Sequence, residues 1–327
     1  MQRRDFLGVL GGAAATWPLA VRAQQPDGMR RVGVLMSSVE NDPNGQARFK
    51  YFVQSLKSLG WIEGGNIHVE VRWPGSDLDL IQEFTRELIA LHCDVIVTTS
   101  TPTTAAVQRE TAKTAIVFTN VSDPIGEGFV SSLASPGGNI TGFINYEGFI
   151  AGKWLELLKE IDPRITRAAI LFNPETAPRG GSYFGRPFEI AAKSLAITSA
   201  AIPVRNDADI EAAIEALGRE PGGGVVMASD SFMGNHRAKF VESAARYRVP
   251  AVYPAPMGGL LSYGPDLSEF YRPVGPYVDR ILKGARPNEL PVQVPTKAEL
   301  VINLRTAKTL GLDVSGTLLA RADEVIE

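Results

Sequence analysis

The 327-residue sequence contains only one cysteine and three histidines, and this scarcity limits the chemistry available to it. A single thiol, Cys93, cannot form a disulfide within the chain, and one cysteine with scattered histidines cannot build a metal cluster. Cys93 lies between an apolar helix end and a buried strand, so we interpret it as a small core residue. We therefore expect no resident metal ion and no cofactor.

The sequence also lacks an excess of positive charge. Its formal net charge is −3 and it has no basic stripe, which argues against nucleic acid as a partner. The G-x-G-x-x-G, P-loop and G-x-S-x-G patterns are absent, and no histidine has an identifiable nucleophile as a partner. We predict that the protein is not an enzyme, with an exported enzyme on a similar scaffold as a less favoured alternative.

The N-terminus has no apolar run of the ~20 residues that a membrane-spanning helix needs, but it carries the three parts of a secretory signal. Arg3 and Arg4 precede Phe-Leu and a short apolar stretch, and Val21-Arg22-Ala23 has the small-x-small pattern of a cleavage site. Adjacent arginines indicate the twin-arginine route. We expect residues 1–23 to be a signal peptide that is cleaved near Ala23, and the mature protein to reach the periplasm.

Predicted strands and helices alternate along the rest of the chain. The strands of a first series cover residues 31–36, 67–73, 94–98 and 115–119, and those of a second series cover residues 167–172, 198–204, 224–228 and 250–253. Strands separated by single helices favour parallel sheets made of βαβ units. The sequence therefore predicts an α/β fold with two doubly wound Rossmann-like lobes.

The last part of the chain is too sparse in elements for a third lobe. The sequence pattern of this part predicts strands at residues 259–263 and 291–294 and helices at residues 268–283 and 300–310. We expect an N-terminal lobe of residues 30–145 plus about 262–290 and a C-terminal lobe of residues 146–261 plus about 291–327. The hinge between them would consist of several chain crossings, near residues 145–147, 254–259 and 291–297.

Short polar side chains gather where the predicted strands end, which is where open α/β sheets bind ligands. The candidates are Ser37, Ser38, Ser100, Thr101, Thr103, Asn120, Ser122, Asp123, Asn173, Ser229 and Asp230. Each is equally compatible with a role as the cap of its own helix. A helix start such as that at Thr101 suits a carboxylate, whereas Asp123 and Asp230 would suit a ligand ammonium group. Tyr146 and Tyr253 are candidates for stacking on a flat ligand, although aromatic residues more often belong to a core.

Several longer segments resemble one known family. They are IVFTNVSDPIG at 116–126, SPGGNITG at 135–142, GGLLSYG at 258–264, ILKG at 281–284 and ELVINLRTAK at 299–308. In this order they resemble the ABC transporter substrate-binding family that includes tryptophan and tyrosine binders, over nearly all of the mature chain.

The resemblance implies a type I periplasmic-binding-protein fold whose two lobes close on a small ligand. Its partners would be that ligand and the ABC permease subunits at the membrane, and we expect a monomer. A sensor that presents its ligand to a membrane receptor is the alternative. Carried over position by position, the family's site falls on the same strand ends. Residues 175–187 and 254–257 depart from the family pattern, so an amino acid, an aromatic acid or a similar carboxylate all stay open as ligands.

Overall fold

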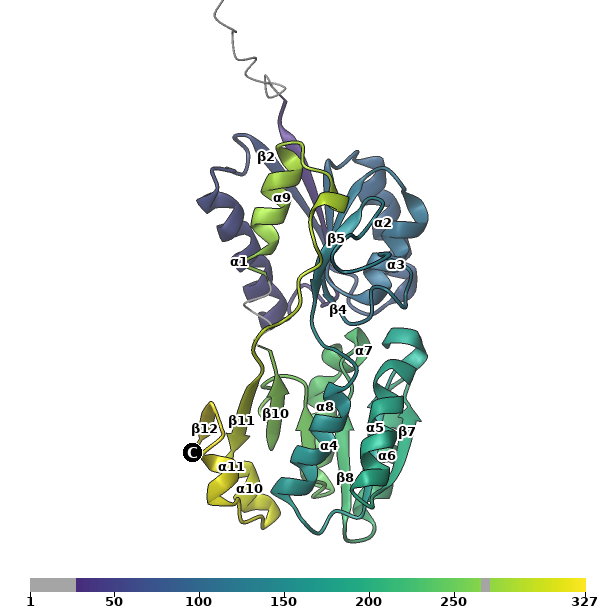
Figure 1. Cartoon of the computed structure of the whole chain (residues 1–327), viewed down its shortest axis with the longest axis vertical. Helices are drawn as coiled ribbons and strands as arrows, with labels where there is room; N and C mark the ends of the chain where they lie inside the picture. Colours follow the sequence, from purple (N-terminus) through teal and green to yellow (C-terminus); the bar gives the residue numbers. More distant parts are fainter. Residues whose placement is uncertain (1–27, 266–270) are drawn as a thin grey trace, which may run out of the picture.

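The computed structural model describes residues 28–265 and 271–327 and has two α/β lobes stacked along its long axis (Figure 1). The predicted signal peptide at residues 1–23 lies outside the described residues. We call the lobe built on the five-stranded sheet the N-terminal lobe and the lobe built on the seven-stranded sheet the C-terminal lobe. The predicted fold class, α/β with two parallel-sheet lobes, is confirmed.

The N-terminal lobe has a parallel sheet in the order β2-β1-β3-β4-β5 between two pairs of helices. Its strands are β1 (Arg30–Leu35), β2 (Ile67–Arg72), β3 (Val95–Thr98), β4 (Ala115–Val121) and β5 (Ile140–Ile144). On one face lie α1 (Pro43–Ser58) and α9 (Val274–Leu282), and on the other lie α2 (Leu78–Ala90) and α3 (Thr101–Glu110) (Figure 1). An apolar core fills the space on each face of the sheet, as a sheet covered on both sides requires.

The C-terminal lobe has a seven-stranded sheet in the order β12-β11-β10-β9-β8-β6-β7. Its strands are β6 (Arg167–Phe172), β7 (Thr198–Pro203), β8 (Gly223–Met227), β9 (Ala251–Tyr253), β10 (Leu261–Gly264), β11 (Glu299–Asn303) and β12 (Glu324–Ile326). Its main helices are α4 (Ile150–Ile161), α5 (Ser182–Ser194), α6 (Asp207–Gly218), α7 (Ser231–Asn235) and α8 (Arg237–Arg246). The pairs α4–α5 and α6–α8 pack together over separate apolar cores.

The ends of the helices carry the polar residues that later line the cleft. Asp42 caps α1 and accepts a hydrogen bond from the backbone N–H of Asn44, with Pro43 at the first helical position. Ser100 caps α3 in a capping box with Thr103, and Asp230 caps α7. These side chains satisfy backbone N–H groups that have no partner within their helices.

The C-terminal segment differs from the prediction in three places. The predicted helix over residues 300–310 is wrong at its start, because Glu299–Asn303 forms β11, antiparallel to β10, and Asn303 then caps α10 (Leu304–Leu310). The predicted strand over residues 291–294 is reduced to a single bridge between Gln293 and Phe143, after a short 3-10 helix at Pro287–Glu289. The chain does not cross between lobes at residues 254–259, because β9 and β10 are neighbours in one sheet.

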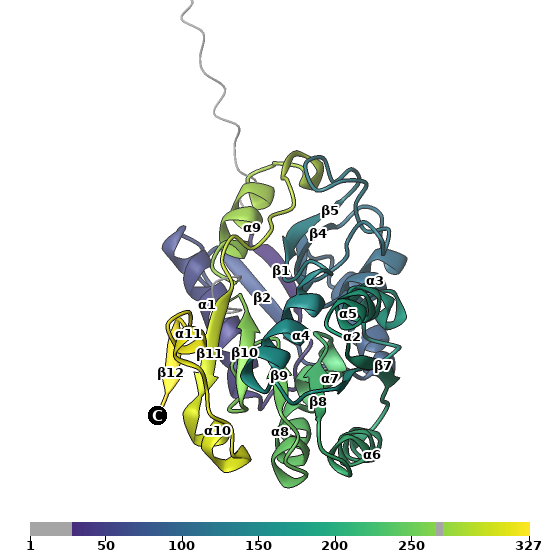
Figure 2. The ribbon, with the colours of Figure 1, turned by 60° about the horizontal axis from the view of Figure 1, so that its bottom comes forward.

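The return to the N-terminal lobe comes after Gly264, three residues later than the expected boundary after residue 261. Leu261–Gly264 still pairs with β9 and β11, whereas Tyr271 belongs to the core beneath α1 and α9. The indole N–H of Trp61 donates to Asp279 of α9 at 2.9 Å, which ties this late helix to the N-terminal lobe. The chain then passes back, and β11, α10, α11 (Gly316–Leu319) and β12 complete one edge of the C-terminal sheet (Figure 2).

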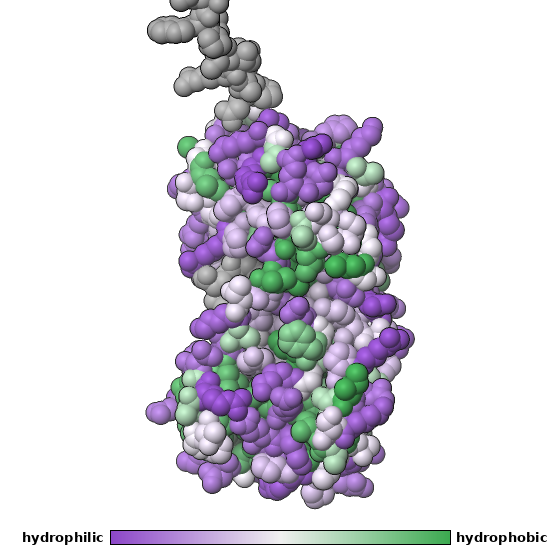
Figure 3. Space-filling model, viewed as in Figure 1, coloured by the Kyte–Doolittle hydropathy of each residue, from purple (hydrophilic) through white to green (hydrophobic). Residues whose placement is uncertain are grey.

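The surface is largely hydrophilic on the face shown in Figure 3, where hydrophobic side chains form separate groups. Within the described residues, no helix combines the length and apolar character needed to cross a membrane.

Candidate ligand-binding site

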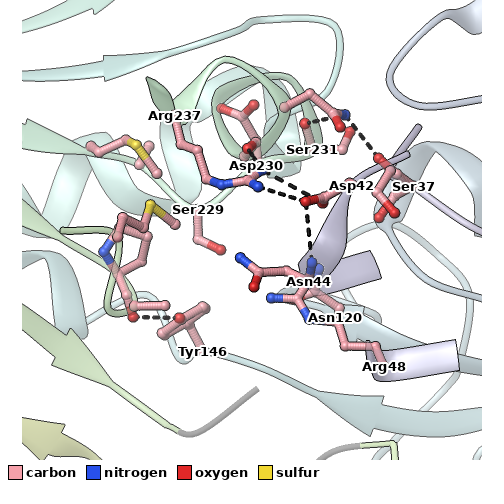
Figure 4. A pocket seen from close by; sticks show the side chains of 18 of the residues that line it. Ser37, Asp42, Asn44, Arg48, Asn120, Tyr146, Ser229, Asp230, Ser231 and Arg237 are labelled. Atoms are coloured by element: carbon pink, nitrogen blue, oxygen red, sulfur yellow. Dashed lines mark hydrogen bonds and ion pairs between the residues drawn. The ribbon is translucent and has the colours of Figure 1, made fainter. Parts of the chain in front are cut away.

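A cavity lies between the lobes, and both lobes contribute its walls (Figure 4). Its volume is about 650 Å³ when the open mouth is included. The N-terminal lobe contributes residues after β1, at the start of α1 and at the end of β4, and the C-terminal lobe contributes the segments after β8 and β9. The cavity therefore lies at the carboxyl ends of parallel strands, where the topology places ligands.

Two serines after β1 form one part of the N-terminal wall. Ser37 is held in place because its N–H donates to Thr99 Oγ1 at 2.7 Å and its hydroxyl donates to the Thr99 carbonyl at 3.0 Å. Ser38 is 7% exposed, and its hydroxyl has no hydrogen-bond partner among the described residues. A buried hydroxyl without a partner costs roughly 1–3 kcal/mol, so Ser38 keeps unused hydrogen-bonding capacity beside the cavity.

A buried amide network joins the two lobes at the first chain crossing. Asn145 donates to Asn120 Oδ1 at 2.7 Å and to Ser229 Oγ at 3.4 Å, and it accepts from Ser122 Oγ at 2.8 Å. Asn120 adopts a left-handed backbone conformation (φ 57°), which asparagine tolerates better than most residues. The network places the Asn120 and Ser229 side chains on opposite walls of one cavity (Figure 4).

Arg48 supplies a positive charge to the cavity from the second turn of α1. The side chain is half-buried and contacts the hydroxyl of Tyr271 through a hydrogen bond. Burial raises the pKa of Tyr146, and the nearby Arg48 charge offsets this only in part. Tyr146 therefore stays neutral, and its hydroxyl donates to the Pro254 carbonyl at 2.6 Å.

Asp230 lies on the opposite wall, and its carboxylate is largely used within its own lobe. It accepts from the backbone N–H groups of Met233 at 2.8 Å and Asn173 at 3.1 Å and from Thr176 Oγ1 at 2.9 Å. Desolvation raises the pKa of Asp230 to about 6, because it outweighs these hydrogen bonds. The group thus acts as a cap that also organises the loop after β6.

Direct contacts between the lobes border the cavity. Arg237 of α8 donates to Asp42 at 2.5 Å (Figure 4), and the Asn235 side-chain amide donates to the Ser37 carbonyl at 2.8 Å. Away from the cavity, the N–H of Arg179 donates to Glu127 at 2.6 Å. These contacts define an arrangement in which the two lobes are closed on each other.

The cavity brings together six of the thirteen predicted residues: Ser37, Ser38, Asn120, Tyr146, Ser229 and Asp230. Ser100 and Thr103 are buried and hydrogen-bond each other in the cap of α3. Thr101 lies between the lobes in a second, separate cavity formed with residues 174–177. For Ser100 and Thr103, the capping role that we left open accounts for the hydrogen bonds between their side chains and backbone groups.

The other predicted residues lie outside the main cavity. Ser122 is buried in the Asn145 network, and Asp123 accepts from the Gly126 N–H at 2.9 Å and pairs with Arg179 at 3.7 Å. Asn173 is buried and holds the loop after β6. Tyr253 packs edge-on against Phe240 in the core of the C-terminal lobe.

Sequence reasoning did not single out several polar, charged and methionine residues that line the cavity. They are Asp42, Asn44, Arg48, Met227, Asn235 and Arg237. The Asp-Pro pair at 42–43 is a helix-start signal, and it could have shown that α1 begins close to the end of β1. Nothing in the sequence connects Arg237 with Asp42, because 195 residues separate them.

The site offers no support for a metal ion. Among the described residues, no three His, Cys, Asp or Glu side chains come close enough to hold one. Cys93 is buried in the N-terminal core, and burial raises the pKa of its thiol to about 11. A thiol with a raised pKa is a poor nucleophile, which agrees with the interpretation of Cys93 as a core residue.

Comparison with known proteins agrees with this architecture. A family described as "ABC transporter substrate binding protein" matches residues 32–326. A tyrosine-binding protein of Clostridioides difficile (strain R20291) is 22% identical over 293 residues, which cover 88% of this chain and 84% of that protein.

Two solved structures show the same fold. A conserved domain protein of Vibrio cholerae O1 biovar eltor superposes with a TM-score of 0.83 at 26% identity, covering 91% of this chain and 100% of that one. An ABC domain of Streptococcus pneumonia in complex with L-Trp superposes with a TM-score of 0.83 at 22% identity, with the same coverage. The fold is that of type I periplasmic binding proteins, and the chain belongs to the ABC transporter substrate-binding protein family.

Proposed function

We propose that this protein is the periplasmic solute-binding component of an ABC importer. The observation that carries the proposal is a cavity whose walls come from both lobes and whose border is bridged by the Asp42–Arg237 and Asn235–Ser37 contacts. A ligand in such a cavity contacts both lobes only when they are closed. Ligand binding therefore favours the closed state by the free energy of those additional contacts.

The chain crossings act as the hinge in this proposal. One is the segment between β5 and α4, which includes Asn145, another follows β10, and the last lies between Gln293 and β11. Short connecting segments of this kind absorb the backbone rotation of domain closure. The permease would then recognise the closed, loaded protein, and no bond of the ligand is made or broken.

The walls suit a small ligand with a polar end and an apolar body. Arg48, Ser229 and Asn120 offer hydrogen-bond donors, whereas Met227, Met257, Tyr146 and Pro254 offer apolar surface. A few polar groups among apolar ones are typical of small-molecule sites. One relative is named as a tyrosine-binding protein and another is described in complex with L-Trp, which supports an amino acid, an aromatic acid or a similar carboxylate as the ligand here.

Export completes the proposal. The Arg3-Arg4 pair and the cleavage pattern ending at Ala23 support twin-arginine secretion to the periplasm. Expression of the full chain should yield a periplasmic protein whose N-terminal sequence begins at Gln24. Replacement of Arg3 and Arg4 by lysine should retain the protein in the cytoplasm.

The import role is tested by uptake. Cells that lack the gene should lose uptake of the compound that stabilises the purified protein against heat, and the wild-type gene should restore it. Uptake that is unchanged without the gene would refute the transport role. Conversion of the compound by the purified protein would refute the non-catalytic role.

A further inference from the structure

The described residues that line the cavity include two acidic and two basic side chains, and not all of these charges are paired. Asp42 and Arg237 neutralise each other across the cleft at 2.5 Å. Asp230 is directed to its own lobe through Met233, Asn173 and Thr176. Arg48, in contrast, forms no ion pair among the described residues.

Both carboxylates already have strong partners. Asp42 also caps α1 through the N–H of Asn44, and its side chain is 7% exposed. An ammonium group would have to compete with a guanidinium for Asp42 or with several donors for Asp230. A second cation close to Arg48 and Arg237 would also be repelled by like charge.

In the described part of the chain, neutral hydroxyl groups lie near Arg48. The tyrosine hydroxyls near it are those of Tyr146 and Tyr271, both buried and both with raised pKa values. Ser38, on the same wall, has a buried hydroxyl without a partner in the described part of the chain. A guanidinium has a planar fork of donors that matches a carboxylate in a bidentate geometry.

We propose that Arg48 anchors the carboxylate of the ligand and that the cleft selects acids that carry no ammonium group. This inference rests on the proposed function and narrows its ligand class to organic anions with an apolar body. The methionines at 227 and 257 and the prolines at 254 and 256 receive that body. The selection is electrostatic, because among the described residues that line the cleft the unpaired charge is positive and both carboxylates already have partners.

The experiment compares matched pairs of compounds that differ in the amino group. Isothermal titration calorimetry is performed on the purified protein with hydrocinnamate against phenylalanine, phloretate against tyrosine and indolepropionate against tryptophan. Benzoate and phenylacetate extend the set of acids, and hydrocinnamamide serves as the uncharged analogue. We expect at least one acid to bind, with a Kd at least about 10-fold lower than that of its amino acid, and the amide to bind no better than the amino acid.

Variants of Arg48 test the anchor itself. Arg48→Gln should raise the Kd of the acid by about 10- to 100-fold, which is the range expected when a hydrogen-bonded charge is lost. Arg48→Lys should restore part of the affinity, because it keeps the charge without the fork. Arg219→Gln, on an exposed arginine of the C-terminal lobe, is the matched control and should leave Kd unchanged.

Each outcome has a defined meaning. Tighter binding of the amino acid than of its acid, or an Arg48→Gln variant with unchanged Kd, overturns the inference and leaves the proposed function standing. Binding of hydrocinnamamide with none of the acids bound has the same meaning. A protein that binds none of these compounds contradicts the proposed function as well.

Discussion

The ion pair between Asp42 and Arg237 is predicted to control closure, and a double-mutant cycle tests this. The pair joins α1 of one lobe to α8 of the other at 2.5 Å, and the two side chains are 7% and 26% exposed. Asp42→Asn removes the charge but keeps an amide oxygen that caps helices well. Arg237→Gln removes the partner charge, so the fold of each lobe should persist in both variants.

The size of the effect follows from the burial of the pair. Exposed ion pairs contribute roughly 0–1 kcal/mol, whereas close, desolvated charge pairs at interfaces couple by about 1.5 kcal/mol or more. A partly buried pair should therefore contribute about 1.5–3 kcal/mol to the closed state. Because apparent affinity falls with the population of the competent state, each single variant should raise the ligand Kd by about 10- to 100-fold.

Calorimetric titration of the wild type, both single variants and the double variant gives the coupling energy directly. We expect the double variant to bind about as weakly as the weaker single variant, and X-ray scattering of the ligand-free variants to show a more open molecule than the ligand-free wild type. Arg164→Gln is the matched control, because Arg164 pairs with Asp162 at 2.8 Å within one lobe, and it should leave Kd unchanged. Additive losses, or unchanged Kd values in both single variants, would refute the closure role of the pair.

Three further predictions concern stability. Trp154→Ala should lower the unfolding free energy, measured in urea, by about 3–5 kcal/mol. The reason is that this indole is fully buried and its N–H donates to a backbone carbonyl. A loss of unfolding free energy below about 1 kcal/mol would contradict its place in the core. Gly142→Ala should destabilise strongly in the same assay, since a Cβ there would lie 2.0 Å from the Phe118 carbonyl oxygen, and Gly316→Ala, with open space around it, should have little effect. The pKa of Asp230 is raised in the folded protein to about 6 from an ordinary value of 3.8. The protonated carboxyl therefore contributes to the free energy of unfolding, and this contribution is complete below pH ~4. It is lost as the pH rises to ~6, and the loss amounts to up to about 3 kcal/mol. Asp230→Asn should abolish this part of the pH dependence of the unfolding free energy. A wild-type unfolding free energy that rises between pH ~4 and ~6, relative to that of the variant, would contradict the prediction.

The sequence was sufficient to predict most of the fold, because buried parallel strands leave strong local signals. The apolar runs of β1, β3 and β8 end at polar residues, and the helices between them carry their own caps. The C-terminal segment gave a weaker signal. Leu300, Val301 and Ile302 fit a helix or a strand equally well, and only pairing with β10, which is distant in sequence, decides for the strand.

The candidate site was only partly predictable for a different reason. Strand ends identified Ser37, Asn120 and Ser229 because the topology fixes their position. Arg48 and Arg237 lie on helices, where a charged residue most often faces solvent, and only the packing of the two lobes turns them toward one cavity. Thr103 shows the converse case, since its hydroxyl, in the first turn of α3, belongs to the capping box of that helix and does not line the main cavity.

The central claim is that the closed cleft binds a small solute between the two lobes, and a crystal structure with the tightest-binding acid tests it most directly. We predict that the ligand contacts Arg48 of α1 and the segment after β8 at the same time, with its carboxylate on the guanidinium and the Asp42–Arg237 pair intact. A ligand bound to one lobe alone, outside the cleft, or chemically altered in the crystal would contradict the account.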